Sequence, residues 1–157
     1  MNHILHFLPI RNLNRLLHRL PKRDFKSERS TLYFFKSHIL PLPSDVAHLG
    51  GRKLSIQTQY GSIRHHLDSI FLQLVLLLVS DSFPYFEKMS GVALNDQNQL
   101  EIWVQQSPRS IDTVKQFLLK QFADIMNELG LKEPVPSIDD KPIKPLLSPQ
   151  KREHKAQ

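Results

Sequence analysis

MSGVAL at residues 89–94, the polar turn Asn95–Asn98 and LEIWV at residues 100–104 form the stretch that determines the fold. Apolar and polar side chains alternate on both sides of the turn, a pattern typical of a β-hairpin. We therefore predict that Trp103 lies on a strand paired with the strand through Val92.

Two segments upstream of this hairpin also have strand character. Gly50-Gly51 marks a turn, and residues 52–58 (RKLSIQT) then alternate polar and apolar side chains, which predicts a strand. Residues 31–39 (TLYFFKSHI) are aromatic and apolar and fit either a strand or a short buried helix. Leu40–Pro43 then forces an extended loop, because residues that precede proline avoid the helical region.

Helical spacing of apolar residues appears twice. Residues 63–80 are apolar on most sides, which predicts a buried helix. A second, amphipathic helix begins at Ser110 or Asp112, either of which can cap it, and ends near Leu129. Gly130 follows where a helix commonly ends in a left-handed residue.

The two ends of the chain carry other signals. Residues 1–23 are basic and contain no acidic residue, and the leucines of Leu13–Leu20 follow helical spacing. This favours an amphipathic helix that docks on the domain; the alternative is a mitochondrial presequence. Residues 132–157 combine prolines and charges without a hydrophobic period, so we predict a disordered tail. A single domain then spans residues 1–131.

Composition and motifs exclude several classes of function. The chain has no cysteine, which removes disulfides and thiolate chemistry. No glycine-rich phosphate loop, GxSxG or HExxH motif occurs, and His65-His66 cannot both face one metal ion from a helix. The longest apolar run, Ile70–Val79, is about half the roughly 20 residues of a spanning helix. A net charge of +6 favours an anionic partner. We expect an α+β binding protein that is not an enzyme and uses no metal or cofactor.

Trp103, the only tryptophan, has two interpretations. On a hairpin strand its indole can pack in the core, or it can offer a stacking surface worth roughly 1–3 kcal/mol to a nucleotide base. Arg52, at the start of the other clear strand, can meet a phosphate.

Taken in order, these segments resemble the messenger-RNA cap-binding family of translation initiation factor 4E. The resemblance covers residues from about 12 to 129 and is carried by the order and spacing of its parts. Those parts are Leu13–Leu20, Tyr33–Pro41 (YFFKSHILP), Gly50-Gly51-Arg52, Leu67–Val75 (LDSIFLQLV), Ser82-Phe83, and Gly91–Leu94 with Leu100–Trp103.

This resemblance implies a curved antiparallel sheet with about three helices on its convex face. It also implies a concave pocket in which two tryptophans sandwich a methylated guanine, a glutamate pairs with the guanine edge, and basic residues hold the phosphates. The sandwich gains a cation–π component because methylation makes the guanine cationic. In this chain only Trp103, near the methyl group, and Arg52, a phosphate contact, carry over as cap-binding residues.

The sequence departs from the family at several functional positions. Pro43 and Ser44 stand where the family has the Trp-Glu pair of the pocket. The first sandwich tryptophan and the family's first strands would precede the start of this chain. The hairpin turn Asn95–Gln99 offers no arginine or lysine for the phosphates, and Asn14 replaces the tryptophan that anchors a partner helix.

The sequence therefore predicts a factor-4E-like translation initiation protein with weakened or lost binding of the mRNA 5′ cap, a 7-methylguanosine nucleotide. The resemblance also implies a scaffold partner of the initiation factor 4G type, and we expect a cytoplasmic protein. The alternatives are a protein–protein interaction module on the same scaffold that acts in translational regulation, or a mitochondrially imported protein.

Overall fold

The computed structural model describes residues 3–6, 31–57, 63, 65–95, 97, 99–106, 108–132 and 134–145. The helix predicted around Leu13–Leu20 and the last part of the predicted tail, residues 146–157, lie outside the described residues.

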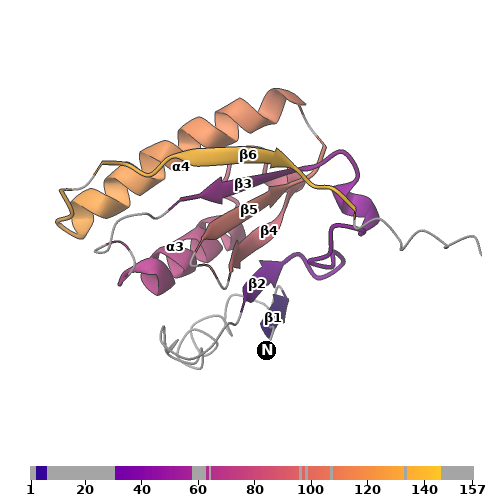
Figure 1. Cartoon of the computed structure of the whole chain (residues 1–157), viewed down its shortest axis with the longest axis horizontal. Helices are drawn as coiled ribbons and strands as arrows, with labels where there is room; N and C mark the ends of the chain where they lie inside the picture. The colour runs from indigo at the N-terminus through magenta and orange to yellow at the C-terminus, as the bar shows by residue number, and fades with distance from the viewer. Residues whose placement is uncertain are drawn as a thin grey trace, which may run out of the picture.

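Six strands form one sheet in the order β1-β2-β4-β5-β3-β6 (Figure 1). β1 pairs with β2 in parallel, and all the other neighbours are antiparallel. The strands are β1 (His3–His6), β2 (Leu32–Phe35), β3 (Arg52–Ile56), β4 (Met89–Leu94), β5 (Leu100–Val104) and β6 (Ile138–Pro142). The α+β class and the curved, largely antiparallel sheet are thus confirmed, and the segment from Thr31 forms a strand rather than a helix.

The predicted hairpin is confirmed as β4 and β5. Gly91 lies opposite Trp103, and Val92 lies opposite Ile102. The turn is held by Asn95, whose side-chain oxygen accepts hydrogen bonds from the backbone N–H groups of Gln97 and Gln99, each at 2.9 Å. The polar turn therefore fixes the register of the strands through a side chain that mimics backbone pairing.

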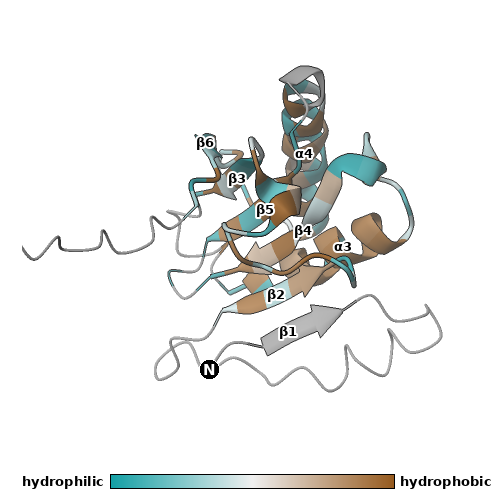
Figure 2. Ribbon diagram, turned by 90° about the vertical axis from the view of Figure 1, so that its right-hand side faces the viewer, coloured by the Kyte–Doolittle hydropathy of each residue, from teal (hydrophilic) through white to brown (hydrophobic). Residues whose placement is uncertain are grey.

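Two α-helices of the described part, α3 (Leu67–Val79) and α4 (Pro108–Glu128), lie on one side of the sheet (Figures 1 and 2). α4 begins earlier than predicted, since proline suits the first helical position, where its missing N–H needs no partner. Gly130 has φ +68° and follows α4 as predicted. Its N–H donates to Asn127 O at 3.1 Å, and the Leu131 N–H donates to Met126 O at 2.9 Å, which closes the helix end.

The sheet has apolar clusters on both faces. On the helix face, the face covered by α3 and α4, alternate residues of the four strands β2 to β5, such as Leu54 and Ile102, belong to one core cluster with residues of both helices. The opposite face, called here the Trp103 face, carries a smaller cluster. Its buried members are Phe35, Ile39, Ala93, Trp103 and Ile143. Because strand side chains alternate between faces, the two clusters arise from the same strands.

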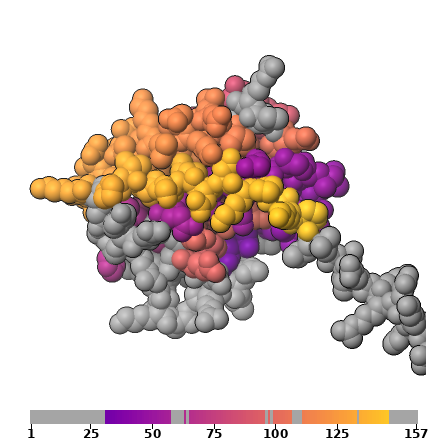
Figure 3. Space-filling view, turned by 45° about the horizontal axis from the view of Figure 1, so that its top comes forward, coloured from indigo at the N-terminus to yellow at the C-terminus, as the bar shows by residue number. Residues whose placement is uncertain are grey.

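The disordered tail predicted from residue 132 is wrong for Ile138–Pro142, which form β6. This strand pairs with β3 along its whole length, with Asp140 opposite Leu54. In Figure 3 it runs in yellow across the surface of the molecule. Ile143 directly after it is buried on the Trp103 face, and its N–H donates to Gly51 O at 3.0 Å. This segment has no hydrophobic period of its own. It is ordered by pairing with the edge of β3 and by burial of the single apolar side chain of Ile143.

In the part of the chain that the structure describes, no helix combines the length and the apolar character needed to cross a membrane.

Candidate functional site

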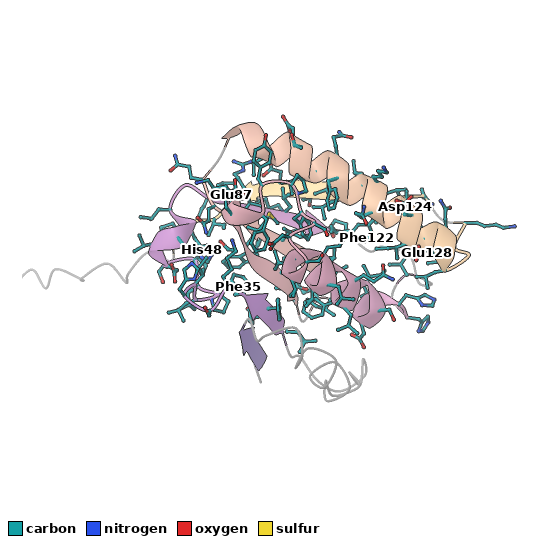
Figure 4. All side chains as sticks on the ribbon, turned by 180° about the vertical axis from the view of Figure 1, so that it is seen from behind. Phe35, His48, Glu87, Phe122, Asp124 and Glu128 are labelled. Atoms are coloured by element: carbon teal, nitrogen blue, oxygen red, sulfur yellow. The ribbon has the colours of Figure 1, made fainter. Side chains whose placement is uncertain are left out.

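Trp103 lies near the centre of the Trp103 face and is only 4% exposed. Two rings contact it edge-on: the Phe35 ring centroid is 5.4 Å away and the His48 ring centroid 4.9 Å away. Phe35 comes from β2 and His48 from the 3-10 helix η1 (Val46–His48), and the two side chains lie close together in Figure 4. Neither ring stacks flat on the indole. Trp103 is therefore packed as a core residue, in a group of three rings whose planes are inclined to one another by 62°, 76° and 82°.

The loop that delivers His48 is held by its own side chains. The Asp45 carboxylate accepts hydrogen bonds from the N–H groups of Leu40 and Ala47, both at 2.8 Å. These two donors hold the pKa of Asp45 below its ordinary value. His48 Nδ1 lies 2.7 Å from Leu42 O, and since a carbonyl only accepts, Nδ1 carries the proton. The loop thus fixes the imidazole against Trp103.

Glu101 is a buried carboxylate beside Trp103, with 7% of the residue exposed. Its Oε2 accepts the indole N–H of Trp103 at 3.1 Å, and its Oε1 accepts from Asn95 Nδ2, also at 3.1 Å. The ammonium group of Lys53 lies 3.2 Å from Oε1 and 5.5 Å from the centroid of the Trp103 ring. The charge of Glu101 is therefore offset by Lys53, and the two other donors fix the direction of the carboxylate.

Sequence reasoning missed Glu101 and Lys53. Residues 101 and 103 are two positions apart on β5 and therefore lie on one face, so the sequence did indicate that Glu101 is a neighbour of Trp103. Lys53 meets them only because β3 pairs with β5 in the register that sets Lys53 opposite Trp103. That register is not visible in either strand alone.

Arg52, the second predicted cap-binding residue, lies on the helix face. Its Nε donates to Asp140 Oδ1 at 2.7 Å, and Lys115 of α4 lies 3.2 Å from Asp140 Oδ2. Arg52 shares its face with Leu54, since both are even-numbered residues of β3. The structure therefore does not bring Arg52 and Trp103 together, because the sheet separates their side chains.

Asp140→Asn is expected to lower the free energy of unfolding by about 1 kcal/mol at neutral pH, an ordinary value for partly exposed ion pairs. Burial disfavours the Asp140 carboxylate, but hydrogen bonds from Arg52 and Lys115 outweigh it and hold its pKa below the ordinary 3.8. The unfolded chain then binds more protons than the folded one, so this stabilisation is complete above pH 3.8 and is lost as pH falls through the folded-state pKa.

Chemical denaturation of the wild type and of Asp140→Asn, at neutral pH and near pH ~2, measures this effect. Asp139→Asn is the matched control, because Asp139 is the more exposed neighbour and its contact with Lys141 is longer, at 3.6 Å. An equal loss at both pH values would contradict the role given to the Asp140 charge.

A hollow of about 430 Å³ lies at one end of the sheet and is lined by Lys36, Ser37, His38, Phe86 and Glu87. The Lys36 ammonium donates to the carbonyl oxygens of Phe86 at 2.8 Å and Glu87 at 3.2 Å. Burial lowers the pKa of Lys36. The lining includes neither Trp103 nor Arg52, so this hollow is separate from both predicted site residues.

Over the described residues, no three histidine, aspartate or glutamate side chains gather in a way that fits a metal ion.

One protein family matches this chain in sequence, and several solved structures resemble it in fold. The sequence model of one family, described as eukaryotic initiation factor 4E, matches residues 1–134. No curated protein matches the sequence at a significant level.

Solved structures with a fold similar to that of this chain include three complexes of eIF4E-3 proteins. Two are eIF4E-3 of Ascaris suum. Its complex with the m2,2,7G cap has a TM-score of 0.65 and 21% identity, covering 88% of this chain and 76% of that one. Its complex with the m7G cap has a TM-score of 0.64 and 19% identity, covering 90% and 78%. The third, C. elegans eIF4E-3 with the 4E-binding protein Mextli and a cap analog, has a TM-score of 0.58 and 17% identity, covering 83% and 73%. At such low identity this likeness establishes the fold alone.

Proposed function

Because this chain belongs to the eukaryotic initiation factor 4E family, as its sequence suggested, we propose that it is a translation factor of that family whose own affinity for the mRNA 5′ cap is weak. In this proposal it is a binding protein rather than an enzyme. The similar eIF4E-3 of Ascaris suum was solved in complex with two different caps, so a cap is the first class of ligand to test.

The burial of Trp103 is the observation that supports weak binding. A base stacks on a ring only where the face of the ring is open. This indole is 4% exposed and packs with Phe35, His48 and Ile143. Pro43 and Ser44 provide neither a stacking ring nor a carboxylate in the loop before η1. Each missing stacking wall removes roughly 1–3 kcal/mol, so the loss of two lowers affinity by several powers of ten.

Charge on the Trp103 face supports the same proposal. Lys53, the cation next to Trp103, is already paired with the buried carboxylate of Glu101 at 3.2 Å, which weakens its attraction for phosphates. Arg52 is paired with Asp140 on the other face, and its raised pKa follows from that hydrogen bond. What remains for a phosphate chain is general attraction to a protein with net charge +6.

Titration with 7-methyl-GTP and with GTP, followed by quenching of the single tryptophan, tests this function. We expect weak quenching by both nucleotides, affinities that differ by less than about tenfold, and binding that declines steeply with salt. Heat-unfolded protein is the control for quenching that does not require the fold. Tight, methyl-selective quenching would overturn the proposal.

The second candidate function is a protein-interaction module on the same scaffold. Leu76 on α3 is 44% exposed, on the side of the sheet away from Trp103. A similar C. elegans protein is bound to a 4E-binding protein, so a partner-binding surface can coexist with this fold. Absence of quenching by both nucleotides would favour this second function.

A further inference from the structure

The loop between β2 and β3 presents apolar side chains to solvent. Leu40, Leu42, Val46 and Leu49, called here the loop patch, are 52%, 49%, 79% and 56% exposed. The other large hydrophobic side chains that are exposed among the described residues are Leu76, Tyr85 and Val135, from three separate segments. Single exposed apolar side chains are ordinary, whereas a cluster of them marks a contact surface. The loop patch is therefore a candidate interaction surface.

The loop that carries this patch is a fixed part of the fold. The Asp45 carboxylate holds the backbone N–H groups of Leu40 and Ala47, and the Gly51 N–H donates to His48 O at 2.9 Å. The 3-10 helix η1 lies beyond the ends of the strands, at the right of Figure 1. Because the loop is already held in one conformation, presenting its apolar side chains to a partner costs little conformational entropy.

The C-terminal segment leaves the sheet at the same end as this loop. β2 ends there and β3 begins there, because the register sets Phe35 beside Gly91 and Lys53 beside both Trp103 and Lys141. The N–H of Ile143, directly after β6, donates to Gly51 O at 3.0 Å. The described part of the chain stops two residues later, so residues 146–157 start close to the base of the loop.

Basic residues gather around this end of the sheet. Lys36 follows β2, Lys88 precedes β4, and the exposed lysines Lys141 and Lys144 lie at the end of β6. Residues 146–157 add Lys151, Arg152 and Lys155 against a single acidic residue, Glu153. The acidic residues of the described part nearby are Glu87 and Asp45, and Asp45 is occupied by two backbone donors. The loop patch is therefore bordered by positive charge, which favours an anionic partner.

The chemistry of the loop patch favours a lipid surface over a protein partner. Its members are leucine and valine, whereas tryptophan, tyrosine and arginine dominate the binding energy of protein interfaces. A stable protein interface also engages about 20–30 residues on each side, many more than one loop tip supplies. A few aliphatic side chains beside basic groups are sufficient for reversible attachment to an anionic bilayer.

We propose that the loop patch inserts into the surface of a membrane that contains anionic lipids. The surrounding lysines and the basic residues of segment 146–157 attract the lipid headgroups, and the aliphatic side chains enter the boundary between headgroups and acyl chains. Such attachment lies on the membrane and requires no spanning helix. It is independent of cap affinity, since it uses neither Trp103 nor Arg52.

Cosedimentation of the full-length protein with lipid vesicles tests the proposal. The two probes are vesicles of phosphatidylcholine alone and vesicles of equal parts phosphatidylcholine and phosphatidylserine. We expect binding to the mixed vesicles that is at least about tenfold stronger than binding to phosphatidylcholine and that declines with salt. No binding of the wild type to the mixed vesicles would overturn the proposal and leave the loop patch to a protein partner.

The double substitution Leu42→Ser with Val46→Ser removes apolar surface without changing charge. It is expected to weaken binding to the mixed vesicles at least about tenfold, because two aliphatic side chains no longer leave water. Leu76→Ser is the matched control, since Leu76 is 44% exposed but lies on α3, and it is expected to bind as the wild type does. Unchanged emission of Trp103 shows that each variant is folded.

Substitution of Lys151, Arg152 and Lys155 by glutamine in the full-length chain tests the contribution of charge. We expect binding to the mixed vesicles to weaken at least about fivefold, with little change on phosphatidylcholine. Binding that depends on these three residues but survives the double substitution in the loop would contradict insertion of the loop patch. An equal loss in Leu76→Ser would also contradict it, because the effect would then not be specific to the loop.

Discussion

Gly91→Ala is expected to lower the free energy of unfolding by about 3 kcal/mol or more, which is severe for the addition of one methyl group. A Cβ at Gly91 would lie 2.4 Å from Phe34 O and 2.5 Å from the Phe35 ring. The first of these atoms is backbone of the neighbouring strand, so it cannot move without separating β2 from β4. Equilibrium denaturation with urea measures the loss.

Gly130→Ala is the matched control for this substitution. Gly130 has φ +68°, and among the described residues nothing beyond its chain neighbours lies within 4 Å of the position that a Cβ would take. Alanine there therefore adds backbone strain without a clash, and that strain costs about 1 kcal/mol. If Gly91→Ala were no more destabilising than Gly130→Ala, the close approach of β2 to β4 would be wrong.

Truncation after Leu131 is expected to lower the free energy of unfolding by about 2–4 kcal/mol. It removes β6, the Asp140 ion pairs with Arg52 and Lys115, and the buried side chain of Ile143. Burial of one isoleucine contributes about 1.5–3 kcal/mol, and partly exposed ion pairs add up to about 1 kcal/mol. The exposed edge of β3 also becomes free to pair with other chains.

Trp103 fluorescence provides a second measure of the same truncation. Ile143 packs in the cluster that contains Trp103, so its removal is expected to shift the emission to longer wavelength as water reaches the indole. Truncation after Pro145 is the control, because it retains β6 and Ile143. If the two truncated chains had equal stability and equal emission, residues 132–145 would not be part of the domain.

The local sequence pattern was sufficient to predict those elements that depend only on residues close to one another in the chain. The hairpin followed from alternation around a polar turn, and the end of α4 followed from Gly130, whose conformation the helix terminus requires. The buried character of α3 followed from apolar residues on most of its sides. In each case spacing along the chain specifies which side chains share a face, so no knowledge of distant partners is needed.

Tertiary structure decided two features that the sequence did not predict: the strand β6 and the neighbours of Trp103. β6 is ordered by the edge of β3 and by Ile143, and neither influence is visible in a proline-rich segment read alone. The candidate site depends on register: Trp103 and Arg52 were grouped from sequence, yet pairing of β3 with β5 sets Lys53, not Arg52, beside Trp103 and Glu101. Successive residues of a strand point to opposite faces of the sheet. Arg52 and Lys53 are one position apart in the sequence, but their side chains therefore lie on opposite sides of the sheet.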